Sequence, residues 1–207
     1  MTDHGESDQR PVSADTGLFR SPVGSEAELL SVLSGIQERG GIGTTDLGDA
    51  IEHADRYVAL LPRSPGRLAD LGSGGGLPGL VIASRRPDLQ IVLVERRLTR
   101  ADLLRRAVSA LQMTDRVAVH AADVRQLAEA EGAGFDVVTA RSFAAPTVTA
   151  VWAGRLLRSG GLLLVSEPPS DGPDAVTHPA RWPADHLDRC GLELVDVTHG
   201  IRRCRRR

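Results

Sequence analysis

The chain has 207 residues, a formal net charge of −2 and an apolar fraction of 41%, which suits a single globular domain with its own core. The near-neutral charge excludes a global electrostatic attraction to nucleic acid. All 25 basic residues are arginine. Neither a lysine Schiff base nor the lysine of a Walker-type phosphate loop is therefore possible.

The two cysteines, Cys190 and Cys204, form no C-x-x-C pair, so we predict neither a metal site nor a disulfide framework. No run approaches the ~18 apolar residues of a membrane helix. The polar, acidic N-terminus is unlike a signal peptide. We therefore expect a cytoplasmic protein that makes no contact with membranes.

The first 62 residues predict a disordered leader and two helices. Residues 1–24 are rich in Asp, Ser, Gly and Pro and are expected to be disordered. A helix is expected from Ser25, because Glu28 completes a capping box ahead of an apolar stripe. A second helix is expected over residues 44–62, ending at Pro62.

From residue 66 the sequence alternates between short apolar runs and helical patterns. The expected strands are residues 67–71, 90–95, 116–123, 135–140 and 161–167, the last following a turn at 159–161. The helices between them are expected at residues 77–86, 99–113, 124–131 and 145–158. This alternation predicts an α/β fold with an open, mostly parallel sheet and right-handed crossovers.

The C-terminal part is less regular. A proline-rich loop is expected over residues 168–183, then a short helix near His186 and an antiparallel hairpin over 192–207. We predict one domain over residues 25–207, in which a helical extension, 25–62, precedes a Rossmann-like core, 66–207.

The stretch "LADLGSGGGLPGL", residues 68–80, holds two overlapping glycine patterns. Glycines let a strand-to-helix turn present backbone amides to a ligand. The strand is expected to end near Leu71, so the turn begins at Gly72, which favours the G-x-G-x-G frame over the G-x-G-x-x-G dinucleotide fingerprint. In that frame Gly72, Gly74 and Gly76 hold the ligand, and Gly79 belongs to the start of the helix.

Acidic residues stand at the carboxyl ends of the first three expected strands and indicate the ligand. The carboxylate of Asp70 would repel a pyrophosphate but suits an ammonium group. S-adenosylmethionine carries such a group in its amino acid part. Glu95 lies where acids bond the ribose hydroxyls of nucleoside ligands. Asp123 is either an acceptor for an adenine amino group or the N-cap of the next helix. We therefore predict a site for S-adenosyl-L-methionine.

Four segments together resemble the GidB/RsmG family, the 16S ribosomal RNA guanine-N7 methyltransferases. They are "DLGSGGGLPGL", "VLVERR", "FDVVTARSFA" and "LLRSGGLLLVSE". The resemblance implies a class I S-adenosylmethionine-dependent methyltransferase fold and small-subunit ribosomal RNA as the partner. The cofactor contacts that it implies are Gly72, Gly74, Gly76, Leu77, Glu95, Ala122, Asp123 and Arg141.

The chain departs from the family pattern in two places. The N-terminal helices lack the usual Asn-Leu-Thr segment, and His53 precedes Asp55 at a different spacing from that of the family. After the fifth strand the family usually has Lys-Gly, where this chain has "SEPP".

Guanine N7 carries a lone pair and no proton, so its methylation needs no general base, and we predict no catalytic residue beyond those that orient the substrate. Phe143 is either a stacking partner for the target base or a core aromatic. The C-terminal "IRRCRRR" either follows phosphates or is a solvated tail.

Three alternatives differ in substrate or class. The first is a small-molecule methyltransferase with the same cofactor-binding half, and the second is a cofactor-binding protein without catalysis. The third, an NAD-dependent dehydrogenase, is disfavoured because a chain without lysine has no Tyr-x-x-x-Lys.

Overall fold

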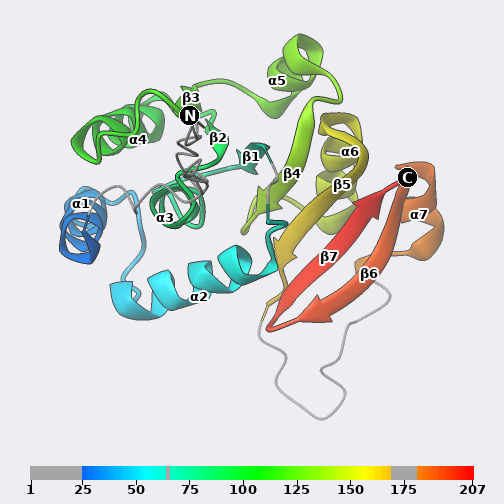
Figure 1. The fold of residues 1–207 in the computed structure, drawn as a ribbon, viewed down its shortest axis with the longest axis horizontal. Coiled ribbons are helices and arrows are strands. Elements are labelled where there is room, and N and C mark those ends of the chain that lie inside the picture. The colour runs from blue at the N-terminus through cyan, green and yellow to red at the C-terminus, as the bar shows by residue number, and fades with distance from the viewer. Residues whose placement is uncertain (1–24, 64–65, 169–180) are drawn as a thin grey trace, which may run out of the picture.

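The computed structural model describes residues 25–63, 66–168 and 181–207. The predicted leader at residues 1–24 and most of the proline-rich loop lie outside the described residues. In the described residues, seven strands form one sheet in the order β3-β2-β1-β4-β5-β7-β6, parallel except for β7. Figure 1 shows this sheet between two groups of helices.

The strands are β1 (Arg67–Leu71), β2 (Gln90–Val94), β3 (Val117–His120), β4 (Phe135–Ala140), β5 (Leu157–Ser166), β6 (Leu192–Thr198) and β7 (Ile201–Arg206). The helices are α1 (Glu26–Glu38), α2 (Leu47–Leu60), α3 (Gly79–Arg85), α4 (Leu98–Ala110), α5 (Val124–Glu131), α6 (Pro146–Leu156) and α7 (Ala184–Arg189). The predicted α/β class and mostly parallel sheet are therefore confirmed. None of these helices is both long and apolar enough to cross a membrane.

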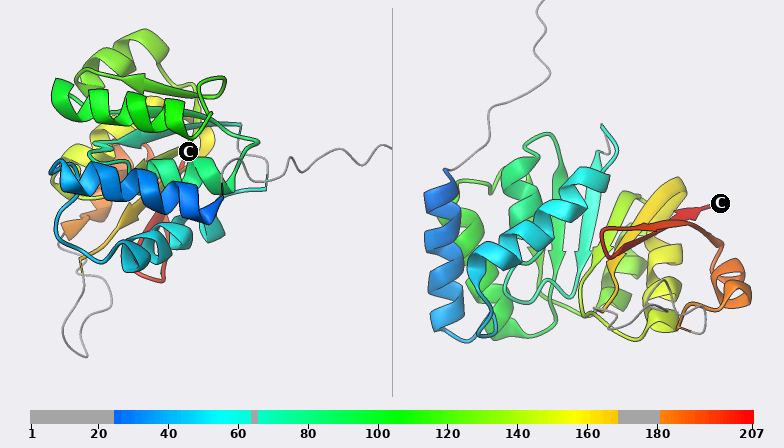
Figure 2. Two further views of the ribbon diagram at one scale, coloured as in Figure 1. Left: turned by 90° about the vertical axis from the view of Figure 1, so that its left-hand side faces the viewer. Right: turned by 90° about the horizontal axis from the view of Figure 1, so that it is seen from below.

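The two faces of the sheet carry separate apolar clusters. Helices α1 to α4 cover one face, where Leu68 of β1 is buried with Leu33 of α1. Helices α5 to α7 cover the other face, where Ala69 and Leu71 of β1 are buried with Ala153 of α6. Successive residues of a strand point to opposite faces, so the continuous apolar runs of the sequence fit a sheet covered on both sides. Figure 2 shows the same arrangement from two further sides.

The beginning of α1 confirms the predicted capping box. The Ser25 hydroxyl accepts from the Glu28 amide, and the Glu28 carboxylate accepts from the Ser25 amide. Helices α1 and α2 also share the apolar cluster of α3 and α4, since Leu29, Ile51 and Ala54 are buried in it. The helical extension therefore forms part of the main core.

The predicted turn at residues 159–161 is wrong, because these residues continue a strand. Helix α6 ends at Leu156, and β5 begins at once with Leu157, which is opposite Phe135 of β4. The register then shifts before Leu162, and Gly160 in this irregular stretch has φ +78°. The glycines thus serve a β-bulge that the sequence pattern did not distinguish from a turn.

The C-terminal hairpin forms as predicted, but the arginines are not a solvated tail. Strands β6 and β7 are antiparallel and joined through His199 and Gly200, which have φ of 52° and 74°, as a two-residue hairpin turn requires. Within β7, Arg202 pairs with Glu167 and Arg203 with Asp196. These two side chains are therefore paired within the fold, whereas phosphate contacts by the exposed arginines of this segment stay a prediction.

Tyr57 of α2 joins the ends of β4 and β5. Its hydroxyl donates to the Ala140 carbonyl at 3.0 Å and accepts from the Ser166 amide at 2.9 Å. The ring is fully buried, and burial raises the pKa of Tyr57 to about 12. This hydroxyl therefore stays protonated and holds two neighbouring strands at their carboxyl ends.

We expect Tyr57→Phe to leave a buried amide and a buried carbonyl without partners, which costs ~1–3 kcal/mol. In a chain of this length that lowers Tm by ~2–4 °C per kcal/mol, measurable by thermal unfolding followed by circular dichroism. The control is Thr99→Val, which removes an exposed hydroxyl of α4 and should leave Tm almost unchanged. A Tyr57→Phe protein with the wild-type Tm would contradict this role.

Candidate functional site

The glycine loop runs from the end of β1 to the start of α3. Gly72, Gly74 and Gly76 have φ of 66°, 55° and 97°, a region that L side chains rarely adopt. The Gly74 amide donates to Glu95, whereas Gly76 packs against the side chain of Leu80. The G-x-G-x-G frame therefore describes the backbone geometry of this loop.

Gly79 has a different role, because it brings α3 against the sheet. A Cβ on Gly79 would overlap the side chain of Leu93 and lie 2.6 Å from Asp70 Oδ2. Gly79 is the first residue of α3, and Pro78, preceded by the buried Leu77, is its N-cap. The structure thus confirms that Gly79 belongs to the start of the helix.

Glu95 lies directly after β2 and is fixed opposite the glycine loop. Its Oε2 accepts from the Gly74 amide at 3.1 Å, and its Oε1 accepts from the Arg97 amide at 2.8 Å. The residue is only 6% exposed. A carboxylate oxygen accepts two hydrogen bonds, so each oxygen keeps acceptor capacity for a ligand such as a ribose.

Asp70 lies beneath the glycine loop, is fully buried and lines neither of the two cavities described below, so its interaction with an ammonium group stays a prediction. Its Oδ1 accepts from the Thr139 hydroxyl at 2.7 Å, while Oδ2 has no hydrogen-bond partner among the described residues. Burial raises the pKa of Asp70 to about 6. Asp70 points to the face that α3 covers, because it lies two residues after Leu68.

A first cavity of about 450 Å³ opens beside the glycine loop, at the carboxyl ends of β1 and β2. Four of the predicted cofactor residues line it, namely Gly72, Glu95, Ala122 and Asp123. Open α/β sheets bind ligands at this edge. The first cavity is therefore the candidate cofactor site. Gly74 lies next to it, because its amide donates to Glu95, which lines the cavity.

Asp123 caps helix α5, so the N-cap interpretation is confirmed. Its carboxylate accepts from the Arg125 amide at 3.0 Å. Asp123 also lines the first cavity. That its carboxylate accepts a hydrogen bond from the adenine amino group therefore stays a prediction.

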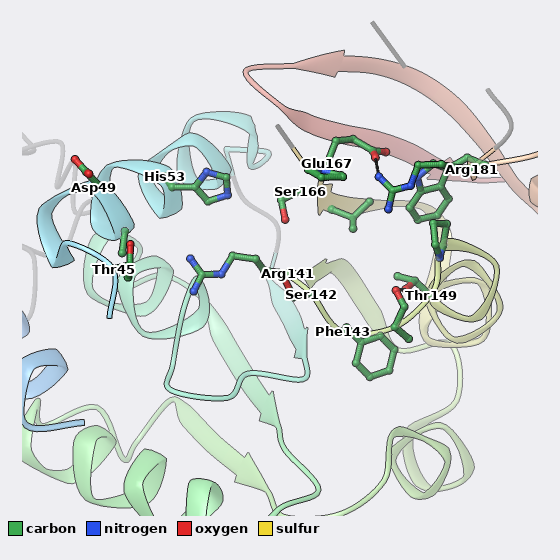
Figure 3. Close-up of a pocket in the computed structure, with 16 residues that line it drawn as sticks. Thr45, Asp49, His53, Arg141, Ser142, Phe143, Thr149, Ser166, Glu167 and Arg181 are labelled. Atoms are coloured by element: carbon green, nitrogen blue, oxygen red, sulfur yellow. Dashed lines mark hydrogen bonds and ion pairs between the residues drawn. The ribbon is translucent and has the colours of Figure 1, made fainter. Parts of the chain in front are cut away.

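A second cavity, of about 590 Å³, opens at the ends of β4 and β5 and is shown in Figure 3. Arg141 lines this cavity and not the first one. Ser142, Phe143 and Ala144 line both cavities and thus form a shared wall. Phe143 lies against the glycine loop, since a Cβ on Gly72 would be 2.9 Å from its ring.

His53 of α2 and Arg141 line the second cavity together (Figure 3). Burial, and then the charges of Arg141 and Arg56, lower the pKa of His53 below its usual value, so the imidazole is neutral at pH 7. Among the described residues Arg141 forms no ion pair within 4.0 Å.

Three residues that line the second cavity were not predicted as site residues from the sequence. Glu167 follows β5 directly, and Arg181 and Trp182 precede α7. A polar residue straight after a buried strand was the signal for Glu167. No sequence pattern indicates that Arg181 and Trp182 lie near it.

Comparison with solved structures defines the class of fold. An O-methyltransferase from Bacillus cereus in complex with SAH aligns with a TM-score of 0.61 and 15% identity, covering 89% of this chain and 93% of that one. The [4+2]-cyclase SpnF aligns with a TM-score of 0.61 and 22% identity, covering 82% and 70%. The chain has the class I S-adenosylmethionine-dependent methyltransferase fold, on which different chemistries occur.

Sequence comparison identifies the family. The GidB family model, described as rRNA small subunit methyltransferase G, matches residues 32–187. Two relatives named ribosomal RNA small subunit methyltransferase G are similar to the chain. The one from Mycolicibacterium gilvum is 32% identical over 198 residues, 90% of this chain and 86% of that protein. The one from Xanthomonas axonopodis is 38% identical over 117 residues, 56% of this chain and 54% of that protein. The chain belongs to the GidB family.

We expect Glu95→Gln to weaken S-adenosylmethionine binding by about 10-fold to 100-fold, because an amide presents a donor where the Gly74 amide and a ribose hydroxyl need acceptors. Isothermal titration calorimetry measures this affinity. The control is Glu131→Gln, which removes a carboxylate paired with Arg67 at 2.9 Å outside both cavities. Equal affinity of Glu95→Gln and wild type would contradict the site.

Proposed function

We propose that the protein transfers the methyl group of S-adenosyl-L-methionine to N7 of a guanine in small-subunit ribosomal RNA. The observation that carries the proposal is the pair of cavities that share the wall Ser142 to Ala144. A methyl transfer needs two sites that meet at one point, one for the donor and one for the acceptor. Membership of the GidB family supports the choice of reaction and substrate.

The residues of the first cavity suit this cofactor. Glu95 would hold the ribose hydroxyls, and Asp123 would accept from adenine. The loop Gly72, Gly74 and Gly76 would leave room for the rest of the molecule. The buried Oδ2 of Asp70 has no partner among the described residues. Because Asp70 does not line the first cavity, the bound ammonium group would reach this acceptor through water. Bound there, S-adenosylmethionine supplies an electrophilic methyl group.

The residues of the second cavity position an acceptor that needs no deprotonation. Guanine N7 attacks with its lone pair, so orientation and proximity are the contributions required of the protein. Phe143 would stack on the base at the shared wall, and Arg141 would bind a phosphate or a base edge. The neutral His53 lies nearby without adding charge.

Arginines around the first cavity support an RNA substrate over a small molecule. Arg96, Arg97, Arg100 and Arg125 line its mouth, and in the described part of the chain none of them is in an ion pair within 4.0 Å. Guanidinium groups free of carboxylates attract phosphates. Ribosomal RNA is cytoplasmic in bacteria, and we propose the same location for the protein.

A small-molecule acceptor is the second candidate, because about 590 Å³ falls within the ~300–1,000 Å³ of typical small-molecule pockets. The family resemblance is also weaker at the second cavity, since this chain has "SEPP" after the fifth strand, where the family usually has Lys-Gly.

The test is nucleoside mass spectrometry of 16S ribosomal RNA from a strain that lacks the gene. We expect one 7-methylguanosine to be lost, and restored when the purified protein and S-adenosylmethionine are added to ribosomal subunits or RNA of the deletion strain. Restoration by Glu131→Gln at the wild-type rate is the control. Unchanged 7-methylguanosine in the deletion strain would contradict the ribosomal substrate and favour a small-molecule acceptor.

A further inference from the structure

Glu167 is a preorganised hydrogen-bond acceptor on the wall of the second cavity. Its Oε1 accepts from Arg202 Nε at 2.6 Å, and its Oε2 accepts from Arg181 Nη1 at 2.7 Å. Its amide also donates to the Gly200 carbonyl at 2.8 Å. The carboxylate is thus fixed from three directions, and its side chain keeps 15% exposure.

Arg202 makes this carboxylate rigid. Arg202 comes from β7, is 2% exposed, and lies over the Trp182 ring with its guanidinium 5.5 Å from the ring centre. A buried ion pair contributes little net stability, because the desolvation of both charges offsets their attraction. Stability alone therefore explains this pair poorly, whereas the placement of a carboxylate in a binding cavity explains it well.

The hydrogen bonds that Glu167 leaves unmade define the ligand chemistry. Each carboxylate oxygen accepts two hydrogen bonds, and each oxygen of Glu167 uses one on an arginine. Among the described residues no further group donates to this carboxylate, so one acceptor position remains on each oxygen. A ligand with two adjacent N–H donors matches both positions in a bidentate pair.

Guanine is the RNA base with that pattern, because its Watson–Crick edge carries N1–H and the 2-amino group side by side. Adenine and cytosine each present one amino group next to an acceptor nitrogen, and uracil presents one N–H between two carbonyls. A carboxylate in this position therefore accepts guanine and rejects the other three bases.

The orientation fits transfer to N7. In guanine, N7 lies on the opposite side from the Watson–Crick edge. In Figure 3, Glu167 and Phe143 lie at opposite edges of the second cavity, with Ser142 between them. A guanine whose Watson–Crick edge is bound to Glu167 directs N7 toward the shared wall, and hence toward the first cavity.

We propose that Glu167 selects guanine by accepting from N1–H and the 2-amino group of the target base. This role rests on the proposed function and adds a specificity residue to it. Asp49 also lines the second cavity, but it is exposed and lies near the beginning of α2, without the two arginines that fix Glu167.

The test compares guanosine with inosine at the nucleotide mapped in the deletion strain. Inosine keeps N7 and N1–H and lacks the 2-amino group, so splint-ligated 16S ribosomal RNA carrying either base isolates one of the two bonds. For the wild-type protein we expect kcat/KM to be about 10-fold higher on guanosine. For Glu167→Gln we expect kcat/KM on guanosine to fall about 10-fold to 100-fold and the preference over inosine to fall below about 3-fold.

Glu131→Gln, which also removes one partner of an arginine, is the matched control and should keep the wild-type preference. If Glu167 had a merely structural role, Glu167→Gln would lower kcat/KM equally on guanosine and inosine RNA. The ratio of the two kcat/KM values would then be unchanged, which would overturn the proposal. Loss of the preference in Asp49→Asn instead would overturn it too.

The wild-type protein alone distinguishes failure of the role of Glu167 from failure of the proposed function. If it methylates inosine as well as guanosine, Glu167 does not bind the 2-amino group, whatever the variants do, while the methyltransferase function stands. If it methylates neither RNA, the proposed function itself fails.

Discussion

The position of β1 between β2 and β4 is the constraint on which the site depends. The chain leaves β1 through α3 on one face of the sheet, and it leaves β4 through α6 on the other face. The loops after these two strands therefore diverge and leave a crevice at their carboxyl ends. The glycine loop forms one side of this crevice. The segment from Ser142 to Ala144, which borders both cavities, forms the other.

The second cavity depends on contacts between distant parts of the chain. Tyr57 of α2 binds the ends of β4 and β5, and the residues that follow these strands, Arg141 and Glu167, line the cavity. Arg202 of β7 then fixes Glu167. The helical extension and the C-terminal hairpin thus contribute to one site with the parallel strands.

The sequence pattern predicted those features that depend on a few neighbouring residues, namely the strands and the conformation of the glycine loop. Apolar runs between turn residues predicted the strands, and the position of Gly72 after Leu71 predicted the loop frame, because φ above 0° is a property of single residues. The burial of Asp70 was not predicted, since the sequence does not say that α3 covers its side of β1. The partners of Tyr57 and Glu167 depend on strand order, which hydrophobic periodicity does not contain.

The central claim is that the cofactor occupies the first cavity and the acceptor base the second. A crystal structure of the protein with S-adenosylhomocysteine tests it most directly. We predict ribose hydroxyls on Glu95, adenine beside Asp123, and the sulfur atom at the wall that Phe143 shares between the cavities. An adenosine group bound among His53, Arg141 and Glu167 would contradict the claim.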